Sequence, residues 1–397
     1  MIRDQLATDL LCPKCRFRFD PLKKEMLYTF PVTGRKKKTR KGRVMGDYDR
    51  IIEEIKKGLT GDAGHDTAYL VKMSGTYREH PLGREIIKEC MRMLYGYFPD
   101  ENKKKIGDAF EEDTKADRKT VEEIKKLVAE RNFGEALFKA EALAKKADIF
   151  PLFREDEASR YYDTAEPFEE DLCEYTQKGE KKMRAAGWCF RDAYFGHGLL
   201  LVEHKRLREA EEELKKALYW DPANTDVIYE LAEVYKMRGD MEKFLELTEA
   251  ATGYAFRPHS FARCLRNYGY YFIEKNEWAA AEACYRLSLA YEEENGNAGR
   301  ELAYISCMTG GRLMDPSPED VKELSEKFGF PFRPKDYIIE IPIECGTYYF
   351  EQGKYEQAEY YLSIADGLAD IPEVKEMLEE IRKRTGALVA KSQNQRR

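Results

Sequence analysis

The chain has 397 residues, of which 36% are charged and 43% hydrophobic, with a formal net charge of −7. No apolar run approaches the roughly 18 residues that a membrane span needs, and no apolar stretch follows a basic start as in a secretory signal. Seven of the nine cysteines are scattered singly along the chain. This usage predicts reduced, mostly buried thiols in a cytoplasmic protein rather than a disulfide framework.

The charge is unevenly distributed along the chain. Residues 1–43 hold 13 Lys or Arg and 4 Asp or Glu, a net of +9, so the remaining 354 residues carry −16. We therefore treat residues 1–46 as a basic N-terminal module, followed by a helical region at 47–118 and a second helical region at 119–397.

The N-terminal module contains the turn Cys12-Pro13-Lys14-Cys15, followed by short stretches with the alternation of β-strands. Such a turn aims two thiolates at one metal, as in half of a zinc ribbon. A complete ribbon needs a second ligand pair roughly 15–20 residues later, where this sequence has neither Cys nor His. Two interpretations stay open: a zinc site that distant ligands or a second chain complete, or a degenerate knuckle with free thiols at Cys12 and Cys15.

The same module ends in a basic run, residues 35–43. Lysine and arginine at this density can bind nucleic-acid phosphates through counterion release. The run has no aromatic residue on which a base could stack, so it does not indicate base reading. A solvated loop is the alternative interpretation.

From Asp47 onward the hydrophobic period becomes that of amphipathic helices. The pattern predicts three helices, then a short helix, then a charged link, at Asp49–Leu59, Asp66–Glu79, Pro81–Phe98, Lys103–Phe110 and Glu111–Lys119. A helical hairpin follows at residues 120–147. Residues 148–189 are interrupted by prolines, and we expect an irregular hairpin there.

The stretch from Tyr194 to Pro222 is organised as two amphipathic helices with small residues at fixed places. Gly198 and Ala210 mark where the two helices cross closely, and Ala217 admits the next hairpin. The crossing position recurs at Ala232, Gly269, Ala303 and Gly346, at intervals of 34, 37, 34 and 43 residues. The small positions used to define these hairpins are Gly198, Ala210, Ala217, Ala232, Gly269, Ala281, Gly346 and Ala358.

This pattern resembles the tetratricopeptide repeat, a helix-turn-helix unit of 34 residues. The resemblance spans about 120–397 and implies an all-α, right-handed solenoid with a C-terminal capping helix at Pro372–Arg384. Two places depart from the pattern. Phe244 stands where a small residue is usual, and the fourth unit is interrupted by a loop at 310–318.

In this family the first helices of the hairpins line a concave groove that binds a peptide. The resemblance places in that groove Asp192, Phe195, Leu199, Tyr229, Glu233, Lys236, Arg263, Arg266, Asn267, Tyr270, Glu340, Ile343 and Thr347. Phe195, Tyr229 and Tyr270 would serve as apolar anchors, and Arg263 and Arg266 could fork onto a peptide carboxylate. The alternative is that these arginines bond neighbouring acidic residues.

The sequence contains no Gly-rich phosphate loop and no histidine pair at the spacing of a metal ligand set. His197 falls on a packed face, where a hydrogen-bonded core histidine is expected. We therefore predict a non-catalytic scaffold, without a cofactor unless zinc binds, that holds a protein or peptide in the groove. The alternative function is a nucleic-acid-associated protein whose N-terminal module contacts phosphates while the solenoid recruits partners.

Overall fold

The computed structural model describes residues 17–20, 25–28, 47–97, 100–149, 159–176 and 182–395. The chain divides into two compact units, Met1–Arg50 and Ile51–Arg397. In the first unit, β1 (Phe17–Asp20) and β2 (Glu25–Tyr28) pair antiparallel, with Phe17 opposite Tyr28. The Cys12–Cys15 turn and the basic run 35–43 lie outside the described residues, so zinc and nucleic-acid binding stay predictions.

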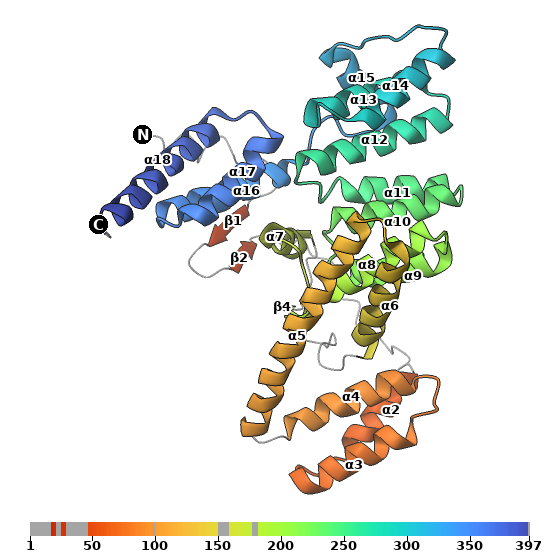
Figure 1. Ribbon diagram of the computed structural model, residues 1–397, viewed down its shortest axis with the longest axis vertical. Coiled ribbons are helices and arrows are strands. Elements are labelled where there is room, and N and C mark those ends of the chain that lie inside the picture. Colours follow the sequence, from red (N-terminus) through yellow and green to blue (C-terminus); the bar gives the residue numbers. More distant parts are fainter. Residues whose placement is uncertain are drawn as a thin grey trace, which may run out of the picture. The chain divides into compact units, whose positions relative to one another are not determined.

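Three predicted helices are confirmed in the region that follows. They are α2 (Asp47–Lys57), α3 (Ala63–Thr76) and α4 (Gly83–Gly96), drawn in orange in Figure 1. The buried carboxylate of Asp66 accepts hydrogen bonds from the backbone N–H of Gly61, at 2.8 Å, and from the Tyr97 hydroxyl, also at 2.8 Å. These bonds tie the turn before α3 to the end of α4.

The charged link predicted at 111–119 is wrong, because α5 (Asp100–Ala129) runs through it as one helix of 30 residues. One side of this polar helix is buried in the fold. Asp117 lies on that side, where its carboxylate accepts a hydrogen bond from the indole nitrogen of Trp188 at 2.8 Å and pairs with Lys146 at 2.7 Å. Because the carboxylate of Asp117 has partners in the fold, it can be buried on the same side of α5 as Val121 and Ile124.

The next segment is an insertion rather than the irregular hairpin that the sequence predicted. α6 (Phe133–Ile149) packs directly against α8 (Phe190–Glu203). Between them lie β3 (Ser159–Tyr162), α7 (Pro167–Thr176) and β4 (Lys182–Ala185), and the two strands pair in parallel. A helix between two parallel strands is the usual crossover connection.

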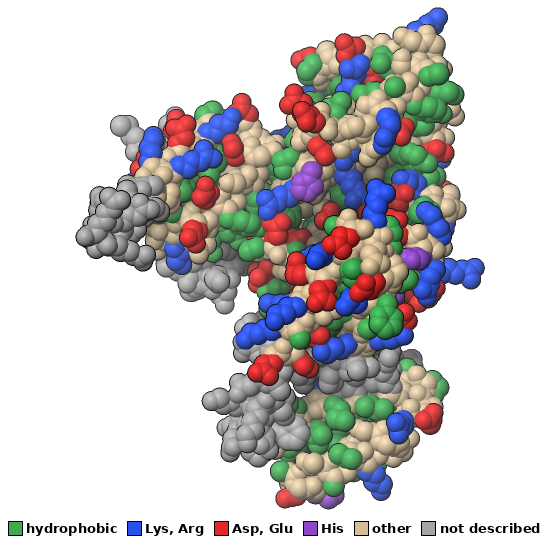
Figure 2. Space-filling view, in the orientation of Figure 1, with side chains coloured by type: hydrophobic (Ala, Val, Ile, Leu, Met, Phe, Trp, Pro, Cys, Tyr) green, Lys and Arg blue, Asp and Glu red, His purple; other side chains and the backbone are tan. Residues whose placement is uncertain are grey.

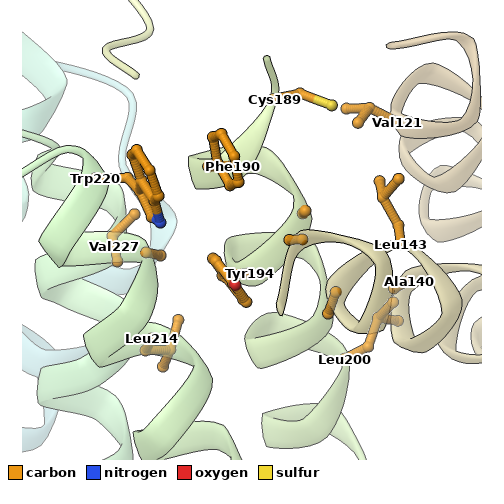
Figure 3. Packing of buried hydrophobic residues seen from close by; sticks show 14 of the residues in the cluster. Val121, Ala140, Leu143, Cys189, Phe190, Tyr194, Leu200, Leu214, Trp220 and Val227 are labelled. Carbon is orange, nitrogen blue, oxygen red and sulfur yellow. The ribbon is translucent and has the colours of Figure 1, made fainter. Parts of the chain in front are cut away.

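Three successive helical hairpins follow the predicted pattern. They are α8 with α9 (Leu207–Trp220), α10 (Thr225–Met237) with α11 (Met241–Ala251), and α12 (Pro258–Glu274) with α13 (Trp278–Tyr291). Figure 3 shows Leu200, Leu214 and Val227 among the side chains that fill the core around α8.

The small crossing positions are confirmed by close approach. A Cβ atom at Gly198 would stand 2.8 Å from Leu214, one at Gly269 would stand 2.6 Å from Tyr285, and one at Gly346 would stand 2.6 Å from Leu362. In each case the opposing residue lies four places after the small residue of the second helix. The alanines at the other small positions, Ala210, Ala217, Ala232, Ala281 and Ala358, are fully buried.

The fourth unit departs further from the repeat than the sequence indicated. α14 (Gly296–Met308) and α15 (Pro318–Phe328) each pack against α13, and the crossing residue Ala303 is exposed. Ser317 begins α15 with a capping box, and Gly329 ends it in the left-handed conformation, with φ of 78°. The loop at 310–318 therefore redirects α15 away from the position that a second helix would take.

The last hairpin, α16 (Asp336–Glu351) with α17 (Tyr355–Leu368), packs against α18 (Pro372–Gln395) and also against the insertion. The ring of Phe168 in α7 contacts Phe256 at 5.2 Å and Tyr361 at 6.2 Å between ring centroids. The Tyr361 hydroxyl donates to Asp171 at 2.7 Å. α7 therefore joins the turn before α12 to α17, a long-range contact that no repeat pattern contains.

Candidate functional site

The candidate site is the face formed by α8, α10 and α12, which we call the first-helix face. Neighbouring first helices are linked by side chains: Arg263 of α12 contacts Glu230 of α10 at 2.9 Å, and Lys236 of α10 lies over the ring of Tyr270 of α12. The predicted groove residues on these helices that are half-buried, and so reachable from solvent, are Asp192, Phe195, Leu199, Glu233, Lys236, Arg263, Arg266, Asn267 and Tyr270.

Tyr229 was predicted as an apolar anchor on this face, and that prediction is wrong. Its side chain is 1% exposed, its hydroxyl donates to the carbonyl of Ser260, and burial raises its pKa well above the usual value. The guanidinium of Arg263 covers the ring, 4.9 Å from its centroid. Tyr229 therefore binds α10 to α12 and is inaccessible to a ligand.

The two predicted arginines are occupied by neighbouring carboxylates, as the alternative interpretation expected. Arg263 pairs with Glu230 at 2.9 Å, and Arg266 pairs with Glu292 at 2.6 Å. The Arg266 side chain is 15% exposed, and the Asn267 amide lies 3.4 Å from the Thr248 hydroxyl. A ligand carboxylate would have to displace these internal partners, so the arginines are poorly disposed to select an acidic peptide.

Around Tyr270 the face is aromatic and predominantly acidic. The Lys236 ammonium lies 5.0 Å from the ring centroid and is paired with Glu233. Burial, followed by the carboxylates of Glu274, Glu233 and Glu301, raises the pKa of the Tyr270 hydroxyl. Three carboxylates therefore act on the Tyr270 hydroxyl, and one ammonium lies over its ring.

Asp192, at the start of the face, belongs to a buried ionic cluster. It pairs with Arg191 at 2.7 Å, and the Arg191 backbone N–H donates to Asp163 at 2.8 Å. Burial raises the pKa of Asp163 to about 7 and that of Asp221 to about 8, with Glu169 adding to the effect on Asp221. Asp221 is fully buried, so its carboxyl is placed to hold the insertion rather than to meet a substrate.

A pocket of about 260 Å³ lies beside this cluster, between α5 and the start of α8. Its wall combines Arg118 and Asp192 with the buried side chains of Trp188 and Cys189. Figure 2 shows acidic and basic side chains interspersed over the visible face of the molecule. The pocket wall likewise carries both signs of charge.

The predicted groove residues of α16, the first helix of the last hairpin, do not extend the first-helix face. Ile343 packs in the apolar cluster between α17 and α18, and the Thr347 hydroxyl lies 4.0 Å from the sulfur of Met377 in α18. Glu340 is exposed on the same helix, α16, whose other sides contact α7 and α17. Ile343 and Thr347 therefore line a surface that α18 covers.

Two residues of the fourth unit were missed by the sequence analysis. Arg300 and Tyr304 of α14 follow Arg266 and Tyr270 by 34 residues, and both are exposed, Tyr304 to 46%. The interval itself could have identified them. α14 thus continues the first-helix face.

The remaining candidates are structural or lie apart from this face. His197 is half-buried, with its Nδ1 atom 3.1 Å from Glu213, whereas its Nε2 atom is buried and has no hydrogen-bond partner in the part of the chain that the structure describes. Among the described cysteines five are buried, while Cys307 is exposed. Within the described ranges, no group of three or more His, Cys, Asp or Glu could hold a metal ion, and no helix is long and apolar enough to cross a membrane.

Comparison with known proteins identifies the repeat type. The family model of the tetratricopeptide repeat matches residues 201–259, which include α9, α10 and α11. No curated protein matches the chain. The match of the family model at residues 201–259 confirms the resemblance at the centre of the repeat region.

Several solved structures are similar to parts of the chain. The pilF protein of Pseudomonas aeruginosa is 21% identical over 49% of this chain and 84% of its own, with a TM-score of 0.28. A tetratricopeptide repeat protein from Parabacteroides merdae is 11% identical over 84% and 98%, with a TM-score of 0.30. The C-terminal part of one from Cytophaga hutchinsonii is 14% identical over 69% and 98%, with a TM-score of 0.28.

Proposed function

We propose that this chain, a tetratricopeptide repeat protein, is a non-catalytic scaffold that binds a segment of a partner protein along the first-helix face. The observation that carries the proposal is a row of half-buried and exposed side chains on the first helices, from Phe195 through Tyr270 to Tyr304. The small residues on the other side of these helices, Gly198, Ala232 and Gly269, are buried in the core.

The composition of this row suits peptide binding. Tyr270 and Tyr304 offer large rings with polar ends, the kind of residue that dominates binding energy at interfaces. Charged groups around the rings adjust specificity and association rate more than affinity. Asp221, whose pKa is strongly raised, is fully buried and accepts a hydrogen bond from Asn224, which favours a structural role over catalysis.

Site-specific photocrosslinking tests the proposal. A benzophenone amino acid replaces Tyr270 on the first-helix face, and as a matched control it replaces Phe138, which is 74% exposed on the second helix of its hairpin. We expect the protein substituted at position 270 to crosslink a discrete partner from native extract. The protein substituted at 138 should not capture that partner.

The proposal also predicts competition. Unlabelled wild-type protein should suppress the crosslink at 270, because both proteins would present the same face. Equal crosslinking from positions 270 and 138, or a crosslink that excess wild-type protein does not reduce, would place partner binding elsewhere on the chain.

A further inference from the structure

The chemistry around Tyr270 points to a particular class of partner. The relevant region, which we call the Tyr270 surface, consists of Glu233, Lys236, Tyr270, Glu274 and Glu301. It combines one residue pair from α10, two residues from α12 and one from α14, so it forms only when these hairpins are stacked. No single helix contains it.

The carboxylates of this surface exceed its cations. Lys236 neutralises Glu233, with which it forms an ion pair. Among the described residues, Glu274 and Glu301 have no ion-pair partner, and Glu274 is exposed. By contrast, Arg263 and Arg266 on the same face are already paired with Glu230 and Glu292. The net charge of the Tyr270 surface is therefore −2, whereas the two arginine sites are neutral.

The ring of Tyr270 already accepts a cation. The Lys236 ammonium stands 5.0 Å from the ring centroid, within the range of a cation–π contact, and also lies 6.0 Å from the Phe244 ring. Phe244 supports the ring edge-on, with 5.9 Å between centroids. The geometry is that of an aromatic face that is braced from one side by Phe244 and covered by the ammonium of the Lys236–Glu233 ion pair.

We propose that the Tyr270 surface binds a cationic segment of a partner protein, whose lysine or arginine side chain takes the ring face that Lys236 now covers. This inference rests on the proposed function, since it assigns a ligand class to the same face. A cationic side chain would gain the π-contact together with the fields of Glu274 and Glu301. An acidic segment would meet these carboxylates and find Arg263 and Arg266 engaged.

Peptide selection on the intact protein tests this assignment. A randomised 12-residue peptide library displayed on phage is selected on immobilised full-length protein, and the enriched peptides are synthesised. We expect Lys or Arg to be enriched, binding to weaken as salt rises, and the peptides to crosslink from position 270. The Glu274→Gln, Glu301→Gln double variant should weaken their binding about three- to tenfold, because it removes two surface charges.

Two comparison variants separate the charge effect from loss of structure. Glu319→Gln with Glu323→Gln removes the same charge from exposed positions of α15 and should leave binding unchanged. Lys236→Gln vacates the ring face and should tighten binding of cationic peptides several-fold, a gain that a damaged fold cannot produce. The inference is refuted if acidic or uncharged peptides are enriched, or if cationic peptides bind the double variant as well as wild type.

The outcomes for the two proposals are distinguishable. Enriched peptides that crosslink from position 270 but lack positive charge would overturn the ligand class and leave the binding face intact. If no peptide is enriched, or if enriched peptides crosslink from position 138 instead, both proposals fail.

Discussion

Substitution of Gly198 by alanine tests whether the small crossing residues are required by close helix approach. An added Cβ would stand 2.8 Å from the Cγ and Cδ2 atoms of Leu214, a side chain that is fully buried. Overpacking of this kind costs about 1–3 kcal/mol. Gly196 on the same helix is the control, because its Cβ would meet Ile124 at 3.8 Å, an ordinary contact.

Both substitutions replace glycine by alanine within α8, so both gain up to about 1 kcal/mol in helix propensity. The gain cancels in the comparison, and the two variants should differ by the overpacking term. We therefore expect Gly198→Ala to be less stable than Gly196→Ala by about 1–3 kcal/mol.

Urea denaturation followed by circular dichroism at 222 nm measures the difference. Leu214→Ala alone leaves a cavity and should cost about 2–5 kcal/mol. Combined with Gly198→Ala it removes the clash, so the double variant should be more stable than the sum of the single effects by at least about 0.5 kcal/mol. Equal stability of the two glycine variants, or strict additivity with Leu214→Ala, would refute the close-approach explanation.

Three further measurements follow from buried and paired groups. The pKa of Asp221 is raised to about 8. The stability that comes from its protonation is therefore complete below about pH 4 and is lost as the pH rises through 8. We expect Asp221→Asn to be more stable than wild type at about pH 9 and to differ little from it at about pH 4, as measured by urea denaturation. Burial raises the pKa of Cys264 to about 12 while Cys307 is exposed, so iodoacetamide followed by peptide mapping should modify Cys307 more than about 100-fold faster. Arg257 pairs with Glu166 before α7, and Arg257→Ala should speed amide exchange in α7 about fivefold, equivalent to about 1 kcal/mol, without changing α9.

The repeat architecture could be predicted because its signals are local and recur. Gly198 and Leu214 lie in one hairpin, and the same pair of positions returns at Gly269 with Tyr285 and at Gly346 with Leu362. A small residue at a fixed interval from a large one therefore identifies both the hairpin and its crossing point. The helices at α8 to α13 needed no long-range information.

Two of the errors have a different cause, which is burial of polar residues by distant partners. Asp117 reads as part of a charged link until Trp188, 71 residues away, donates to it. The parallel pairing of β3 with β4 depends in the same way on contacts beyond the local sequence. Tyr229 stands at a position that faces the ligand in a regular repeat, and it is buried because Arg263 covers it. The hydrophobic periodicity of a segment cannot predict contacts between residues that are distant in the sequence.

The departure in the fourth unit and the exposure of Tyr304 have a common origin. Because the loop at 310–318 leads α15 onto α13, the second-helix position beside α14 is left open and Ala303 is exposed. The next first helix, α16, contacts α7 and α17, where Phe168 and Tyr361 meet. α14 is therefore the last helix of the first-helix face, and its ring at 304 stays 46% exposed beside Trp278. A regular continuation of the stack would have covered this end of the face, so the irregular loop is what leaves an aromatic side chain available next to the Tyr270 surface.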